Sequence, residues 1–179
     1  MEEKELAPAA FRIPESKNMD FGLTVVTLHI GVTDPGTTFM VHENILRARS
    51  VYWEAIFSKY SQKFYTLDDV DAKTFGLYDQ LFYPGRIPSK PAFGGFHDDT
   101  EYGHLCKLYL FTYKYKDLEA QNIVVDALCA RSQESDLFGK AATQEVRDAS
   151  LPSRQCVELI YKSTGQRLGA RRLLIDLYA

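Results

Sequence analysis

The chain has 179 residues and a net charge of −3 at pH 7, and 45% of its residues are hydrophobic while 25% are charged. This balance excludes a wholly disordered chain, and the small negative charge provides no global positive field that would attract nucleic acid or acidic lipid. The three cysteines, Cys106, Cys129 and Cys156, are widely spaced without a C-x-x-C pair, so we expect buried thiols rather than disulfides or a cysteine zinc site.

The first segment, residues 1–20, mixes charged residues, prolines and alanines without periodicity, which predicts a flexible lead-in. It has no central apolar run of the kind that a secretory signal needs, and no stretch elsewhere is long enough to cross a bilayer. We therefore expect an intracellular protein, in the cytoplasm or the nucleus, without a membrane partner.

A hairpin is predicted next. Residues 23–31 alternate between apolar and polar side chains, which indicates a strand. Asp34, Pro35 and Gly36 are turn residues, and residues 38–41 form a second short strand after them.

The spacing then becomes helical. Residues 43–50 and 52–59 predict two short helices, with Ser50 at their junction as a candidate N-cap. Residues 64–67 look like a third strand. Asp71 is a candidate N-cap for a helix that Pro84 and the glycine after it end.

Helices dominate the second half of the chain. Residues 86–98 predict a loop, residues 101–115 a helix, and Asp117 a cap for the helix after it. Pro152 fits the first turn of a helix that continues to residue 161, and residues 171–178 resume helical spacing. The fold class that follows is α+β, with a small, mostly N-terminal sheet covered by helical hairpins and extra C-terminal helices.

A metal site is the strongest enzymatic alternative. His97, Asp98, Asp99 and His104 include suitable ligand types for zinc or iron, and a metal-assisted enzyme is a distant alternative on that ground. The aspartates also precede a predicted helix, where acidic residues cap the backbone, and this explains them without a metal. We expect no metal and no cofactor.

Other catalytic patterns are weak. His42 follows a strand, but no nucleophile motif accompanies it, so we expect a buried histidine that donates to the backbone rather than a catalytic residue. Arg167, Arg171 and Arg172 form the main basic cluster, which is more typical of a solvated helix face than of a phosphate site, so we expect no nucleic-acid partner.

Aromatic residues point to a protein partner. Tyr109, Phe111, Tyr113 and Tyr115 alternate along one predicted helix, and a helix that turns 100° per residue cannot bury all of them against one neighbour. We therefore expect a partly apolar exposed surface there, which favours binding to another protein.

Three blocks of the sequence, taken together, resemble the BTB/POZ family. Residues 39–53 contain F-x-V-H, a leucine, and Ser50 followed by an aromatic pair. Residues 67–87 are similar to the next block of the family, and residues 105–128 to the third. The order of the blocks matches the family. The tail, residues 151–179, resembles the C-terminal region of BTB-domain proteins from filamentous fungi.

The resemblance divides the chain into regions. It implies a lead-in over 1–20, a BTB/POZ domain over 21–131, a polar linker or partial helix over 132–150, and a C-terminal helical extension over 151–179.

The resemblance also implies a protein-interaction module, an adaptor or scaffold, rather than an enzyme. BTB domains self-associate as homodimers or connect partners to cullin-type ubiquitin ligases, and a monomeric ligase adaptor stays open as the alternative. Two partner-binding surfaces are predicted. The first lies on the first helical pair, with Arg49, Tyr52 and Trp53, and the second comprises Tyr109, Tyr113 and Tyr115. Core packing is the competing interpretation for each residue.

Overall fold

The computed structural model describes residues 20–31, 36–83, 85–90, 100–133, 151–166 and 168–178. The centre of the predicted 34–36 turn, most of the predicted 86–98 loop and nearly all of the predicted 132–150 linker lie outside these residues. The elements in chain order are β1 (Val25–Ile30), β2 (Thr37–His42), α1 (Glu43–Arg49), α2 (Val51–Lys59), β3 (Phe64–Leu67), α3 (Ala72–Gln80), α4 (Thr100–Lys114), α5 (Leu118–Gln133), α7 (Arg154–Ser163) and α8 (Gly169–Tyr178).

The strands form a three-stranded sheet in the order β2-β1-β3. β1 pairs antiparallel with β2 and parallel with β3, and a parallel pairing needs a long crossover, which α1 and α2 supply. In β1, Val26, Leu28 and Ile30 are buried while the residues between them are partly exposed, so one face of the sheet covers the core. The predicted α+β class is confirmed.

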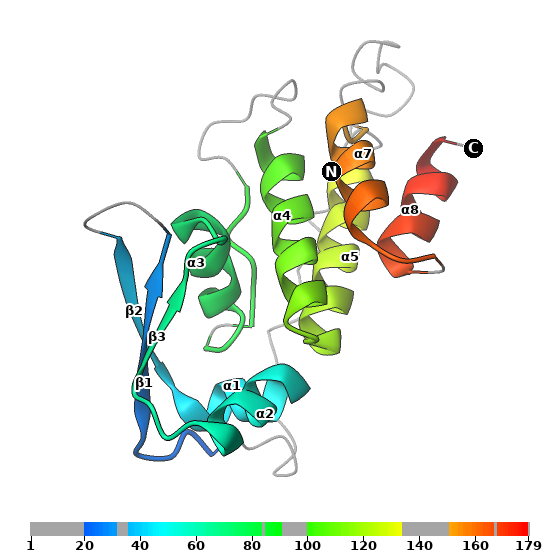
Figure 1. Ribbon diagram of the computed structural model, residues 1–179. Helices are drawn as coiled ribbons and strands as arrows, with labels where there is room; N and C mark the ends of the chain where they lie inside the picture. Colours follow the sequence, from blue (N-terminus) through cyan, green and yellow to red (C-terminus); the bar gives the residue numbers. More distant parts are fainter. Residues whose placement is uncertain are drawn as a thin grey trace, which may run out of the picture.

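Helices cover one face of the sheet. Figure 1 shows the sheet at one side of the molecule, α3 between it and α4, and α7 and α8 on the side farthest from the sheet. α4 packs against α3, α5 and α7, and α8 packs against α5. α4 is therefore enclosed by neighbours, which decides how much of it can reach a partner.

Side-chain caps begin several of these helices as predicted. The Ser50 hydroxyl accepts from the backbone N–H groups of Tyr52 and Trp53, and the Asp71 carboxylate accepts from Thr74 N at 2.9 Å. Asp117 Oδ1 accepts from Ala120 N at 2.8 Å at the start of α5. These bonds satisfy donors that the first turn of a helix leaves free.

The C-terminal helices α7 and α8 differ from two of the expectations. Ser153, not Pro152, caps α7, and Pro152 lies outside the first turn. Arg171 is not a solvated cation, because it donates to Thr164 Oγ1 at 3.0 Å and to the carbonyls of Tyr161 and Thr164. It thereby satisfies carbonyl groups at the end of α7 and joins α7 to α8.

Candidate interaction surface

Arg49, predicted on the first partner surface, lies in the interior. Its side chain is 5% exposed, and its Nε donates to Asp117 Oδ2 at 2.9 Å. The Tyr78 hydroxyl donates to the same oxygen at 3.0 Å, and Asp117 is fully buried. We call Arg49, Tyr78 and Asp117 the buried hub. It holds the end of α1 against the start of α5. Arg49 therefore stabilises the fold under the first predicted partner surface and is not itself accessible to a partner.

Trp53 is also a core residue, with 1% of its surface exposed. Its ring stacks on Tyr115, with centroids 5.2 Å apart and planes 4° from parallel, and on Phe57 at 5.4 Å. Tyr52 is half-buried and meets Trp53 and Tyr115 edge-on. Of the first predicted set, Tyr52 therefore keeps the largest share of accessible side chain, and its binding to a partner stays a prediction.

Two exposed apolar residues beside this site were missed from the sequence. Val51 is 68% exposed and Leu118 is 71% exposed. Val51 follows the cap Ser50, and Leu118 follows the cap Asp117, so each is the first residue of its helix. The sequence signal that could have identified them is an apolar residue directly after a cap, because this position lies outside the buried stripe of the helix. We call Val51, Tyr52 and Leu118 the junction surface.

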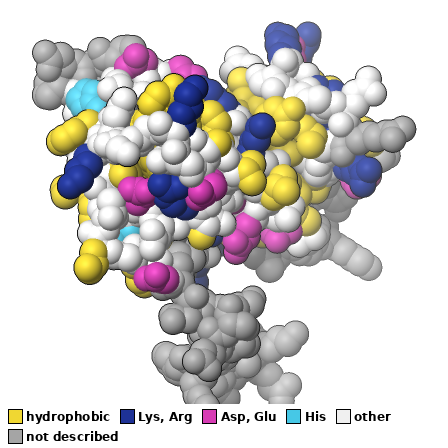
Figure 2. Space-filling view, turned by 60° about the horizontal axis from the view of Figure 1, so that its bottom comes forward, with side chains coloured by type: hydrophobic (Ala, Val, Ile, Leu, Met, Phe, Trp, Pro, Cys, Tyr) yellow, Lys and Arg dark blue, Asp and Glu magenta, His cyan; other side chains and the backbone are white. Residues whose placement is uncertain are grey.

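Direct contacts bring the two parts of the junction surface together. The Ser50 hydroxyl donates to the Tyr115 carbonyl, one residue from Val51. The Arg49–Asp117 ion pair lies one residue from Leu118. Figure 2, which brings the α1–α2 end forward, shows hydrophobic side chains among charged ones on this face. Exposed apolar side chains interspersed with charged ones suit contact with another protein.

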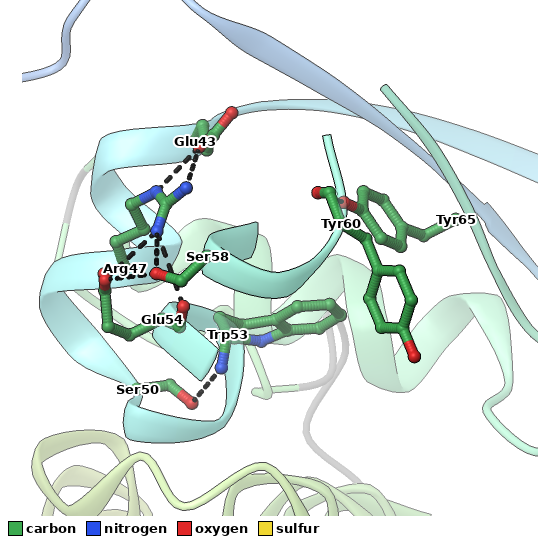
Figure 3. A network of polar contacts seen from close by, with 8 residues as sticks. All are labelled: Glu43, Arg47, Ser50, Trp53, Glu54, Ser58, Tyr60 and Tyr65. Atoms are coloured by element: carbon green, nitrogen blue, oxygen red, sulfur yellow. Dashed lines mark hydrogen bonds and ion pairs between the residues drawn. The ribbon is translucent and has the colours of Figure 1, made fainter. Parts of the chain in front are cut away.

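A charged network runs along α1 and α2 (Figure 3). Arg47 Nε donates to Glu43 Oε1 at 2.7 Å, and Arg47 Nη1 donates to Glu54 Oε1 at 3.1 Å. Arg47 also donates to Ser58 Oγ at 3.1 Å. The hydrogen bond from Ser58, followed by that from Arg47, lowers the pKa of Glu54. Exposed pairs of this kind add little stability, so the network mainly orders the polar surface of the helical pair.

The second predicted surface is largely covered. Tyr109 and Tyr115 are each 1% exposed. Tyr109 lies on α4, which packs against α3, α5 and α7 rather than against one neighbour, and Tyr115, just after α4, packs on Trp53 of α2. This burial corrects the expectation that these two rings face outward. Tyr113 is half-buried, and its contact with a partner stays a prediction.

Tyr113 lines a groove of about 630 Å³ between the turn after β3, α4 and α7. Its apolar lining includes Val70, Leu110 and Phe111. Lys114 pairs with Asp69 beside the groove, and Lys107 Nζ lies 3.6 Å from Asp71 Oδ2. The charges at the groove are therefore balanced by each other. Val70 and Phe111 are buried, so Leu110 and Tyr113, both half-buried, are the more accessible apolar side chains of its lining.

Of the candidate catalytic and metal residues, His42 and His104 are described, and both are partly exposed. His42 is partly exposed, and its Nδ1 lies 3.1 Å from the Tyr83 hydroxyl, which corrects the expected backbone bond of a buried histidine. His97, Asp98 and Asp99 lie outside the described residues. Within the part of the chain that the structure describes, no group of three or more His, Cys, Asp or Glu residues could hold a metal ion. Among the described helices, none has both the length and the apolar composition to cross a membrane.

Buried tyrosines predict a loss of stability at alkaline pH. Burial, and then the nearby Asp117, raises the pKa of Tyr78 well above its usual value, and burial is also the main cause of the raised pKa of Tyr115 and Tyr109. Above about pH 10 the unfolded chain loses these protons while the folded chain keeps them. The free energy of unfolding should therefore fall by up to ~1.4 kcal/mol per pH unit for each such tyrosine.

Urea unfolding followed by circular dichroism between about pH 8 and about pH 11 measures this slope. Tyr78→Phe removes one titrating group and should make the slope shallower. A free energy of unfolding that stays constant across this range would contradict the prediction.

The chain matches a family model that agrees with the fold. Residues 18–121, more than half of the 179 residues, match the family model of the BTB/POZ domain. The chain belongs to the BTB/POZ domain family. Domains of this family generally mediate protein–protein interactions and are not typically enzymatic. No curated protein matches the chain.

Proposed function

We propose that this chain is an adaptor or scaffold that self-associates through the junction surface. The observation that carries the proposal is the exposure of Val51 and Leu118, at 68% and 71%, at the starts of two helices whose preceding residues are joined by the Arg49–Asp117 ion pair and the Ser50–Tyr115 hydrogen bond. Apolar side chains gathered in this way gain free energy when a second chain removes them from water.

The buried hub strengthens the proposal. Arg49, Tyr78 and Asp117 link α1, α3 and the start of α5, with both hydrogen bonds to Asp117 Oδ2 at 3.0 Å or less. Because these bonds fix the two backbone segments, little conformational freedom is lost when a partner docks. A preorganised apolar patch is what a module for protein–protein contact requires.

The remaining features of the proposal follow the domain division. Residues 21–131 are the interaction domain, residues 132–150, which start within the last turn of α5, a polar linker or partial helix, and residues 151–179 a helical extension of the kind found in fungal BTB proteins. The partners are proteins in the cytoplasm or the nucleus, and the chain works without a cofactor and without nucleic acid.

The double substitution Val51→Glu with Leu118→Glu tests the junction surface. We expect the dissociation constant of the homodimer to rise at least about tenfold, because the carboxylates would have to be desolvated in the contact. The free energy of unfolding should change by less than about 0.5 kcal/mol, since both side chains are exposed. Sedimentation equilibrium measures the first quantity and urea unfolding the second.

Ile175→Glu is the matched control, because Ile175 is 58% exposed on α8, away from the junction surface. It should leave association unchanged. Equal dissociation constants for the wild type and the double variant would refute self-association through this surface.

A monomeric substrate adaptor for a cullin-type ubiquitin ligase is the second candidate. The groove beside Tyr113 favours it, because a single chain presents this groove without any dimer contact. A pull-down with the N-terminal domain of a cullin separates the two candidates. Capture of the monomer supports the ligase adaptor, and a dimer that captures no cullin supports the scaffold.

A further inference from the structure

β2 leaves one edge of the sheet open among the described residues. The strand order is β2-β1-β3, so β2 has a hydrogen-bonded neighbour on one side. The pairing with β1 is continuous from Thr37 to His42 and has no bulge. Figure 1 shows the sheet at the side of the molecule with helices on one of its faces. An uninterrupted outer strand presents unpaired backbone groups to any strand of suitable composition.

The hydrogen-bond pattern identifies these groups. Glu43 N donates to Thr24 O, which makes Thr24 and Glu43 a hydrogen-bonded pair. In an antiparallel ladder every second pair is hydrogen-bonded, so Val41 and Phe39 also bond to their partners in β1. Thr27 N instead donates to Lys63 O on the β3 side. Thr27 is the register partner of Met40. The backbone N–H and C=O of Met40 and Thr38, and the N–H of His42, therefore point away from β1, toward the open edge. The C=O of His42, the N-cap of α1, accepts the first hydrogen bond of that helix.

The sequence of β2 lacks the usual protection of an edge strand. The strand reads TTFMVH and contains no lysine, no acidic residue and no proline. Met40 is 72% exposed on the face of the sheet that the helices leave open. Phe64, 73% exposed on β3, shares its register row through Thr27. Two exposed apolar side chains, Met40 beside the open edge and Phe64 on β3, therefore lie in one row across the outer face of the sheet.

We infer that a second copy of this chain pairs antiparallel with β2, edge to edge, about a two-fold axis at Met40. In that register Met40 lies opposite Met40 of the other copy, and Thr38 lies opposite His42. Phe39 lies opposite Val41 on the inner face. No like charges meet at any of these pairs, and the backbone N–H and C=O of Met40 in each strand find partners in the other, which makes the strand complementary to itself.

This inference deepens the proposed self-association by adding a second surface for it. A single strand pair buries less than the roughly 800 Å² per partner of a standard interface, so the contact is weak and depends on concentration. Its separation from the junction surface lets each surface be removed without the other.

Met40→Lys and Phe64→Lys form a matched pair for the test, because their exposed fractions are 72% and 73% on the same face of the sheet. Met40→Lys places two cations opposite each other and should weaken edge pairing at least about tenfold in sedimentation equilibrium. Phe64→Lys adds the same charge away from β2 and should leave the dissociation constant unchanged. Circular dichroism confirms that both variants fold.

Met40→Cys and Phe64→Cys provide a positive test. Bonded antiparallel partners have Cα atoms about 5.5 Å apart, which a disulfide can span. Mild oxidation should link position 40 of one copy to position 40 of another, as mapped by mass spectrometry, and should do so far less at position 64. The link should persist when Val51→Glu and Leu118→Glu are added, because the two surfaces are separate.

Equal association of the wild type and Met40→Lys, or equal cross-linking at positions 40 and 64, would overturn the inference while leaving the junction surface intact. A wild-type chain that stays monomeric would also overturn it. If Met40→Lys instead abolished binding of an extended peptide from another protein and left self-association unchanged, the occupant of the edge would not be a second copy.

Discussion

Asp117→Ala should lower the free energy of unfolding by about 3–5 kcal/mol, since it removes the nearest counterion of the buried Arg49 and leaves only the exposed Glu119 carboxylate, 3.7 Å from Nη1. Asp117 is fully buried. The side chain of Arg49 is 5% exposed, and its Nε lies 2.9 Å from Asp117 Oδ2. The substitution also removes the acceptor of Tyr78 and the cap of α5. Urea unfolding followed by circular dichroism measures the loss.

Two control variants separate these contributions. Asp117→Asn keeps one side-chain oxygen to accept from Ala120 N, and it replaces Oδ2, the acceptor for Tyr78 and Arg49, with an amide NH2 group. Because it retains the cap of α5, it should be less destabilising than alanine. Asp69→Ala breaks the ion pair between Asp69 and Lys114, whose side chains are 64% and 48% exposed. It should lower the free energy of unfolding by no more than about 1 kcal/mol. Equal losses for Asp117→Ala and Asp69→Ala would show that the hub does not support the fold.

Trp53→Ala should lower the free energy of unfolding by about 3–5 kcal/mol through the cavity that it leaves. Trp53 is 1% exposed and lies between the rings of Tyr115 and Phe57, at centroid distances of 5.2 and 5.4 Å. Trp53→Phe keeps an aromatic ring and should lose less. Thermal unfolding followed by circular dichroism compares the variants.

Trp53 also distinguishes a core residue from a contact residue. It is the sole tryptophan of the chain, so its fluorescence reports directly on this site. Emission typical of a buried indole, with no change on dilution of the protein, is expected in the folded wild type. A Trp53→Ala variant with wild-type stability and lost association would contradict the placement of this side chain in the core.

Local features of the fold could be predicted from the sequence because neighbouring residues determine them. Alternation identified β1, and Ser50, Asp71 and Asp117 were recognised as caps because a polar side chain preceded each helical stripe. These signals act over a few residues, within one element or at its ends.

The accessible surface could not be predicted in the same way, because distant segments decide it. Arg49 and Asp117 are 68 positions apart, and their pairing removes Arg49 from the surface. The packing of α4 against α3, α5 and α7 buries Tyr109, and the distant Trp53 covers Tyr115, although their spacing would suit an exposed stripe. Periodicity gives the direction of a side chain from its helix axis, and it does not say how many neighbours enclose that helix.

The same reasoning explains the residues that were missed. Val51 and Leu118 occupy first positions of helices, where apolar residues carry no periodic signal of their own. Only the contacts of the residues before them, Arg49 with Asp117 and Ser50 with Tyr115, bring the two helix starts toward each other. The surface proposed for self-association is therefore a product of tertiary packing.

Sedimentation equilibrium of the whole chain over a range of protein concentrations tests the proposed self-association most directly. Association through exposed apolar surfaces predicts a reversible shift from the 20.4 kDa monomer to a dimer as concentration rises, and a weaker shift after Val51→Glu with Leu118→Glu. A single 20.4 kDa species at every concentration, unchanged by these substitutions, would contradict it.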